Sequence, residues 1–121
     1  SVRILLADDD GISQTIAVAM LEQNGWEVTA VTNGREVLQE LEQESYDLVL
    51  MDVRLQGPMS GVEAAREIHR RFGIPVVFVT ANDDELEGDD LPSPGARITK
   101  PFTDEQLERT LCKILGRMET L

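Results

Sequence analysis

The sequence has few of the features that stabilise secreted proteins or anchor membrane proteins. Among its 121 residues Cys112 is the single cysteine, so no disulfide can form within the chain. No apolar run approaches the roughly 20 residues that cross a bilayer, and the first residues do not form a signal-peptide pattern. We therefore expect a cytoplasmic protein that has no membrane contact of its own.

Positive charge is also scarce. The chain has 11 Lys and Arg against 23 Asp and Glu, which gives a net charge of −12 at pH 7. Such a surface repels the phosphates of nucleic acids, and no basic stripe compensates for it. Nucleic acid is therefore excluded as the expected partner. The acidity alone says nothing about a metal ion, because a negative surface also favours solubility.

Short apolar runs alternate with longer helical patterns along the chain. The runs are rich in Val, Ile and Leu and do not alternate with polar residues, which is typical of strands buried on both faces of a parallel sheet. There are five of them: Val2 to Ala7, Val28 to Val31, Leu48 to Met51, Val76 to Thr80, and Arg97 to Thr99. The length suits one domain, covering residues 1–121.

The segments between these runs predict helices. We expect them over Ile12 to Asn24, Arg35 to Gln43, Ser60 to Gly73, and from Thr103 onward. Two of them open with S/T-x-x-E/Q capping boxes. In the first helix the predicted buried stripe consists of Ile12, Ile16, Ala17, Met20 and Leu21. Residues 82–95, with their glycines and prolines, predict at most one or two helical turns. The pattern predicts a doubly wound α/β domain with helices on both faces of the sheet.

Polar side chains follow four of the predicted strands. Asp8, Asp9 and Asp10 follow the first, Asp52 the third, Thr80 the fourth and Lys100 the fifth. Ligands of such sheets bind at the carboxyl ends of the strands. Carboxylates gathered there repel one another, and a hard cation such as Mg²⁺ relieves that repulsion. A carboxylate can also accept a phosphoryl group, which a lysine and a hydroxyl would help to hold.

Each of these residues also has a structural interpretation. Asp10 is a candidate N-cap of the first helix, and an acidic cluster there complements the helix dipole. Asp52 alone could be a turn former, and Thr80 or Lys100 alone is more often structural. Their joint occurrence at four strand ends favours the functional interpretation.

Over nearly its whole length the chain resembles the receiver domains of two-component response regulators, which have the CheY-like fold. The motifs that carry the resemblance are Ile4-Leu5-Leu6-Ala7-Asp8-Asp9-Asp10, Asp47-Leu48-Val49-Leu50-Met51-Asp52, Val79-Thr80-Ala81 and Lys100-Pro101-Phe102. The resemblance implies a single five-stranded parallel sheet of order 2-1-3-4-5. The departure over residues 82–95 predicts that the family's fourth helix is short or irregular here.

The resemblance also implies roles for the site residues. Asp52 is expected to accept a phosphoryl group from a phosphohistidine, with Thr80 as the switch hydroxyl and Lys100 as the phosphate-binding lysine. Mg²⁺ is expected at Asp8 and Asp9, with ligands from Asp9, Asp52 and the backbone carbonyl of Arg54. The bond between Lys100 and Pro101 is often cis in the family. Such a domain promotes its own phosphorylation and dephosphorylation and is not otherwise an enzyme.

The implied partners are a sensor histidine kinase or a histidine phosphotransfer protein, and an effector that the sequence does not identify. Residues 33–41, together with Gln14, look most like receivers fused to hybrid histidine kinases. Two departures concern the switch and its surroundings. The loop from Leu55 to Gly61 is one residue longer than is common, and Arg97 stands where the family often has an aromatic residue.

Two other functions compete with a phosphorylated receiver. The first is a small Mg²⁺-dependent phosphatase of the haloacid dehalogenase kind, whose Asp-x-Asp pattern Asp8 and Asp10 fit loosely. The position of Asp52 after the third strand argues against it. The second is a degenerate receiver that binds partners without phosphorylation, against which the intact Asp52, Thr80 and Lys100 argue.

Overall fold

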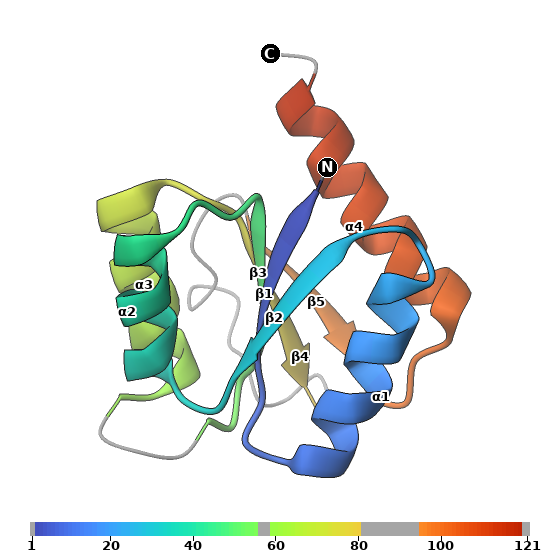
Figure 1. The fold of residues 1–121 in the computed structure, drawn as a ribbon, viewed down its shortest axis with the longest axis horizontal. Helices are drawn as coiled ribbons and strands as arrows, with labels where there is room; N and C mark the ends of the chain where they lie inside the picture. Colours follow the sequence, from blue (N-terminus) through green and yellow to red (C-terminus); the bar gives the residue numbers. More distant parts are fainter. Residues whose placement is uncertain (1, 56–58, 81–94, 120–121) are drawn as a thin grey trace.

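Five parallel strands form one sheet at the centre of the molecule (Figure 1). The computed structural model describes residues 2–55, 59–80 and 95–119. The strand order is β2-β1-β3-β4-β5, which confirms the predicted order. The strands are β1 (Arg3–Ala7), β2 (Glu27–Val31), β3 (Leu48–Asp52), β4 (Val76–Thr80) and β5 (Gly95–Thr99).

Helices cover both faces of this sheet, as the alternating pattern predicts. Figure 1 shows α2 (Gly34–Gln43) and α3 (Gly61–Phe72) on one face. On the other face lie α1 (Gly11–Glu22) and α4 (Asp104–Glu119). Each pair closes its own hydrophobic core against the sheet. The predicted short helix over residues 82–95 falls almost wholly outside the described residues.

The predicted capping residues begin the helices. Asp10 accepts a hydrogen bond from the backbone N–H of Ile12 at the start of α1. At α3 the Ser60 hydroxyl accepts from the N–H of Glu63 at 3.1 Å. The capping box of α4 is reciprocal and joins Thr103 to Gln106. These local bonds set where each helix starts, and so they set the lengths of the loops that follow the strands.

The predicted buried stripe of α1 is partly wrong. Ala17 and Leu21 are buried against the sheet, but Ile12 is 74% exposed and Ile16 is 51% exposed. Apolar residues occupy two neighbouring stripes of this helix, and only one of them faces the strands. The other stripe, with Ile12 and Ile16, is exposed to solvent. The start of α1 lies beside the carboxyl ends of the strands (Figure 1).

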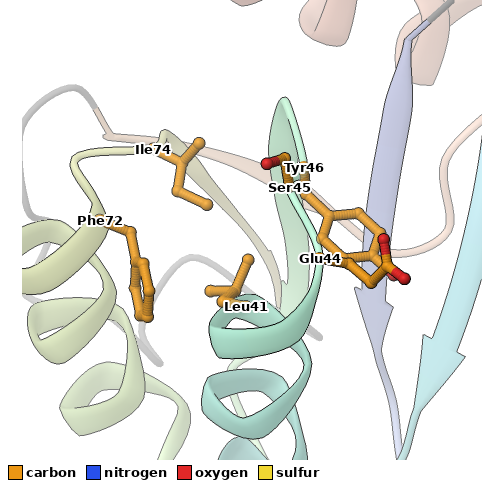
Figure 2. Close-up of a pocket in the computed structure, with 6 residues that line it drawn as sticks. All are labelled: Leu41, Glu44, Ser45, Tyr46, Phe72 and Ile74. Carbon is orange, nitrogen blue, oxygen red and sulfur yellow. The ribbon is translucent and has the colours of Figure 1, made fainter.

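A hollow lies at the opposite end of the sheet, where β3 begins (Figure 2). Its volume is about 150 Å³, and it is lined by Leu41, Glu44, Ser45, Tyr46, Phe72 and Ile74. The Tyr46 hydroxyl donates to Glu40 at 2.8 Å, and the Arg3 guanidinium lies 4.7 Å from the centre of the Tyr46 ring. These contacts fasten the start of β3 and are remote from the predicted site residues.

None of the helices in the described part of the chain has the length and apolarity to cross a membrane.

Candidate functional site

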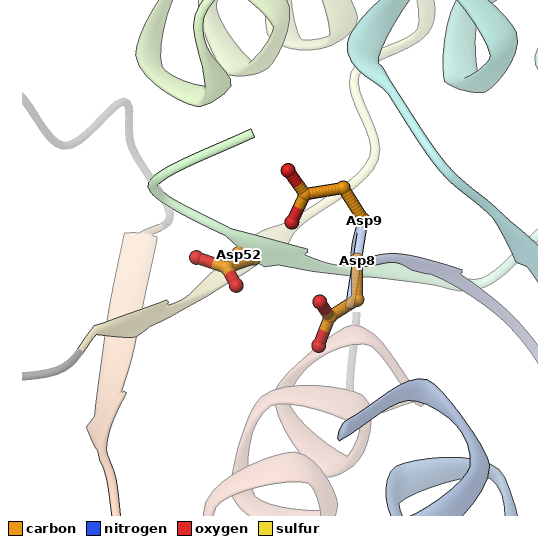
Figure 3. Close-up of side chains that lie close together, drawn as sticks. All are labelled: Asp8, Asp9 and Asp52. Atoms are coloured by element: carbon orange, nitrogen blue, oxygen red, sulfur yellow. The ribbon is translucent and has the colours of Figure 1, made fainter. Parts of the chain in front are cut away.

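Three carboxylates meet at the carboxyl ends of β1 and β3. Asp8 and Asp9 directly follow β1, and Asp52 is the last residue of β3. Carboxylate oxygens from the three residues lie within 4.8 Å of one another. Figure 3 shows the carboxylates of Asp8 and Asp9 turned toward the side on which Asp52 lies. The structure thus brings together residues that are more than forty positions apart in the chain.

The loop that carries Asp8 and Asp9 is held by hydrogen bonds. Asp8 is 5% exposed, and its Oδ1 accepts from the backbone N–H of Asp10 at 2.9 Å. Its own N–H donates to the carbonyl of Val31, at the end of β2. Asp9, in contrast, is exposed to solvent. One acid of the pair is therefore fixed in the protein, while the other faces solvent.

The environment of Asp8 penalises its negative charge. Its pKa is raised above the ordinary value, first because burial removes water from the carboxylate, and further because the negative charge of Asp52 lies nearby. The hydrogen bond from Asp10 and the charge of Lys100 lower the pKa but do not compensate fully. A cation placed among the three acids would remove this penalty.

The carboxylate of Asp52 has two different neighbours. Its Oδ1 accepts from the backbone N–H of Arg54 at 2.9 Å, and its Oδ2 lies 3.6 Å from Nζ of Lys100. The Asp52 side chain is 13% exposed, whereas the Lys100 side chain is 34% exposed. Lys100 is held in turn by its N–H, which donates to the carbonyl of Thr80, and its bond to Pro101 is cis as the resemblance implies.

Thr80 ends β4 beside the acidic cluster. Asp52 pairs with Val79 in the sheet, so Thr80 lies one residue further toward the carboxyl edge. Thr80 is 1% exposed, and its hydroxyl oxygen has no hydrogen-bond partner among the described residues. Buried hydroxyls are nearly always paired. This one is available to a new acceptor placed near Asp52.

The donor set suits a hard divalent cation. Three carboxylates supply the oxygen ligands that Mg²⁺ prefers, and Mg²⁺ keeps several waters when it binds to one or two of them. Lys100 is the one basic side chain in an ion pair with this cluster among those the structure describes. The site therefore combines surplus negative charge, a fixed ammonium group and an unpaired hydroxyl, which fits a transferring phosphoryl group better than a neutral substrate.

Several predicted residues bear on the site less directly. Arg54 is exposed and contributes its backbone N–H to Asp52. Arg97 is exposed on β5. Residues 56–58, within the longer loop, lie outside the described part of the chain. Sequence reasoning missed the contacts of Gln14, because the two backbone carbonyls that its side chain binds lie in the loop after β1 and at the end of β2.

Comparisons with known proteins agree with this geometry. The sequence model of the response regulator receiver domain matches residues 4–111. The CpxR homolog of Haemophilus influenzae, a transcriptional regulatory protein, is 35% identical over 118 residues, covering 95% of this chain and 51% of that protein. The chain spans about half the length of such curated relatives.

Solved structures show the same fold. The receiver domain of a sensor histidine kinase from Pseudomonas aeruginosa PAO1, solved with magnesium coordinated in its active site cleft, is 33% identical with a TM-score of 0.83, and the match covers 96% of this chain and 98% of that one. The response regulator protein TrrA from Thermotoga maritima, in complex with Mg²⁺-BeF, is 26% identical with a TM-score of 0.82, over 94% and 99% of the two chains.

Proposed function

The chain belongs to the family of response regulator receiver domains of two-component systems, and we propose that residues 1–121 form one such domain, in which Asp52 accepts a phosphoryl group from a phosphohistidine. The observation that carries this proposal is the meeting of Asp8, Asp9 and Asp52, with Lys100 3.6 Å from the Asp52 carboxylate. Receiver domains are phosphoacceptors, and this chain is not proposed to turn over an external metabolite.

The metal site follows from the same cluster. Asp9, Asp52 and the backbone carbonyl of Arg54 would hold Mg²⁺, with Asp8 fixing the ion from its buried side. When bound, the ion supplies positive charge that offsets both the carboxylates and the oxygens of the incoming phosphoryl group. The magnesium in the two solved receiver structures supports this assignment.

In the proposed transfer, a carboxylate oxygen of Asp52 attacks the phosphorus atom in line with the bond to the histidine nitrogen. The new O–P bond forms as the N–P bond breaks, and the released imidazole nitrogen takes up a proton. Lys100 holds the attacking carboxylate and a phosphoryl oxygen. The hydroxyl of Thr80 then donates to another phosphoryl oxygen, which gives that buried group the partner it lacks among the described residues.

The product is an acyl phosphate, which water can hydrolyse at the same site. Attack of water on phosphorus breaks the O–P bond to Asp52 and restores the carboxylate, with release of inorganic phosphate. We propose that the same charges that favour uptake also favour this loss, so that the domain catalyses both steps on itself. The movement of Thr80 would bias the surface at β4 and β5, where an effector reads the phosphorylated state.

The apolar face of α1 supports a protein as phosphodonor. Ile16 and Met20 line a hollow of about 420 Å³ together with Pro101, Phe102 and Lys100. Because Lys100 also contacts Asp52, this face and the acidic cluster are continuous. A donor that lies on the apolar face would bring its phosphohistidine over Asp52. A sensor histidine kinase or a histidine phosphotransfer protein fits this requirement.

We also propose that this domain is the receiver of a hybrid histidine kinase. It is supported by the likeness to the receiver of a sensor histidine kinase, at 33% identity. It is tested by the sequence of the full-length protein: a kinase core in the same chain would support it, and an output domain alone would contradict it.

The central experiment measures phosphoryl uptake from acetyl phosphate in Mg²⁺ and in EDTA. We expect one phosphoryl group per chain with Mg²⁺, little in EDTA, and none in Asp52→Ala. Asp104→Ala, which removes an exposed carboxylate at the start of α4, is the matched control and should label like the unaltered protein. Labelling that persists in Asp52→Ala would place the acceptor elsewhere.

The same assay separates the rival functions. Failure of the folded, Mg²⁺-loaded protein to label would support a degenerate receiver. Turnover of a generic phosphate monoester, lost in Asp8→Asn and kept in Asp52→Ala, would support a phosphatase of the haloacid dehalogenase kind.

The role of the apolar face is tested with Ile16→Asp. Because Ile16 is exposed, the variant should fold, and uptake from acetyl phosphate should not change. Transfer from a phosphorylated histidine phosphotransfer protein should fall at least tenfold. Equal loss with both donors would show damage to the site and not to docking.

A further inference from the structure

The side chain of Gln14 connects three segments behind the acidic cluster. Gln14 lies in the first turns of α1, half-buried, and its Nε2 donates to the carbonyl oxygens of Asp8 and Val31, each at 3.1 Å. The Val31 carbonyl also accepts from the N–H of Asp8. One amide group thus joins the loop after β1, the end of β2 and α1.

The chemistry of these contacts requires an amide or another group with two donors. Both partners are carbonyl oxygens, which only accept hydrogen bonds, and a carboxamide nitrogen has two N–H groups to offer. An apolar side chain of the same length would leave the Asp8 carbonyl without this donor. Within the structure Asp8 would then keep its N–H bond to Val31 and its carboxylate bond to Asp10, but not the bond through its carbonyl.

In the part of the chain that the structure describes, the Gln14 side chain bonds to the backbone of the metal-binding loop and to none of its carboxylates. The carbonyl of Asp8 is the acceptor that lies immediately before Asp9, so holding it orients the peptide from which the Asp9 side chain departs. Asp9 itself is exposed to solvent. We propose that Gln14 is a positioning residue that sets the metal affinity of this site by fixing the backbone between Asp8 and Asp9. The proposal rests on the proposed metal site.

The expected loss of metal affinity is modest, because Gln14 acts on the metal site only through the backbone. Removing a partner that orients a metal ligand commonly weakens metal binding about ten- to a hundredfold. Gln14 acts on one ligand through the main chain, and the other ligands are untouched. We therefore expect the affinity to fall by about three- to tenfold, which corresponds to the loss of roughly one hydrogen bond.

The test compares Gln14→Met with Gln39→Met, which makes the same chemical change on the exposed face of α2. Mn²⁺ serves as the probe, and its free fraction is measured by electron paramagnetic resonance. Gln14→Met should bind Mn²⁺ about three- to tenfold more weakly, and Gln39→Met should bind like the unaltered protein. Equal affinity in folded Gln14→Met would overturn the proposal, and so would an equal loss in Gln39→Met.

Two further readouts separate positioning from general damage. In the metal-free protein, the backbone amides of Asp8 and Asp10 should exchange hydrogen faster in Gln14→Met, while that of Val49 in β3 should not change. In the acetyl phosphate assay, the Mg²⁺ concentration for half-maximal labelling should rise, with the rate at saturating Mg²⁺ kept within about twofold. A rate loss that saturating Mg²⁺ does not restore would contradict the positioning role.

The binding and exchange measurements do not require phosphorylation. If neither the unaltered protein nor the Gln14 variants took up a phosphoryl group on Asp52, the proposed function would be refuted. The Mn²⁺ affinities would still decide the role of Gln14. Should Gln14→Met not fold, Gln14→Asn keeps both N–H donors on a stem one methylene shorter. Its Mn²⁺ affinity should also fall, and an unchanged affinity would refute the proposal.

Discussion

Replacing Asp8 by Asn should stabilise the metal-free protein and remove most of its response to Mg²⁺. The substitution keeps an oxygen that can accept the hydrogen bond from Asp10. It removes a buried negative charge whose pKa is raised by desolvation and by Asp52. Because Asp8 is not the proposed acceptor, the effect can be measured without phosphorylation.

The magnitude can be worked from the carboxylate separation. Two unit charges 4.8 Å apart repel by roughly 1 kcal/mol in bulk water and by roughly 3.5 kcal/mol at an effective dielectric constant of about 20. Asp8 and Asp52 are mostly buried, which favours the larger value, but Lys100 offsets part of it. We expect Asp8→Asn to raise the free energy of unfolding by about 1–2 kcal/mol in EDTA, or the melting temperature by about 4–8 °C.

The assay is urea unfolding followed by circular dichroism, in EDTA and in excess Mg²⁺. At a hundred times the dissociation constant, Mg²⁺ adds about 2.7 kcal/mol to a protein with one site. The unaltered protein should gain this amount and the variant much less, so that the order of stability reverses. A variant that is less stable than the unaltered protein in EDTA would refute the reasoning. A variant that gains as much from Mg²⁺ would show that Asp8 does not act on the metal.

Three other predictions follow from the same contacts. In EDTA the stability advantage of Asp8→Asn should vanish below about pH 3.8, where Asp8 is protonated in both folded and unfolded chains. It should grow as pH rises above that value and level off once pH passes the raised pKa of Asp8 in the folded state; urea midpoints across pH 3–7 check this. Gly61→Ala places a Cβ 2.9 Å from the carbonyl oxygen of Asp52, so it should cost about 1–3 kcal/mol and weaken Mn²⁺ binding, whereas loss of stability alone would contradict a close approach to the site. Ser60→Ala removes the bond to the N–H of Glu63 and should cost about 1 kcal/mol with labelling unchanged, as denaturation and acetyl phosphate assays would show.

Much of the fold could be predicted because its signals are local. Strands buried on both faces read as continuous apolar runs, and capping residues such as Ser60 and Thr103 mark helix starts within four residues. The buried stripe of α1 was harder to predict from the sequence. Ile16 and Ala17 are neighbours in sequence and both apolar, and only the docking of the helix on the sheet decides that Ala17 is buried and Ile16 is not.

The acidic cluster was predictable for a different reason. In a parallel sheet the residues after each strand gather at one edge, so Asp8, Asp9 and Asp52 are brought together by topology alone. Gln14 was not predictable in the same way. Its partners are backbone carbonyls, which every residue has, and no sequence pattern shows which of them lie opposite an amide of α1.

The buried hydroxyl of Thr80 has a consequence for how strongly the proposed phosphorylation can shift the domain between two conformations. Its lack of an acceptor among the described residues is a defect of the resting conformation, and a buried unsatisfied hydroxyl costs about 1–3 kcal/mol. A phosphoryl oxygen within reach recovers that amount, which corresponds to about a five- to 150-fold change in the ratio of two conformations. If Thr80 is the switch hydroxyl proposed above, this energy bounds how far phosphorylation of Asp52 can shift the two conformations, and Thr80→Ala would lower that bound while the proposed metal ligands stay as they are.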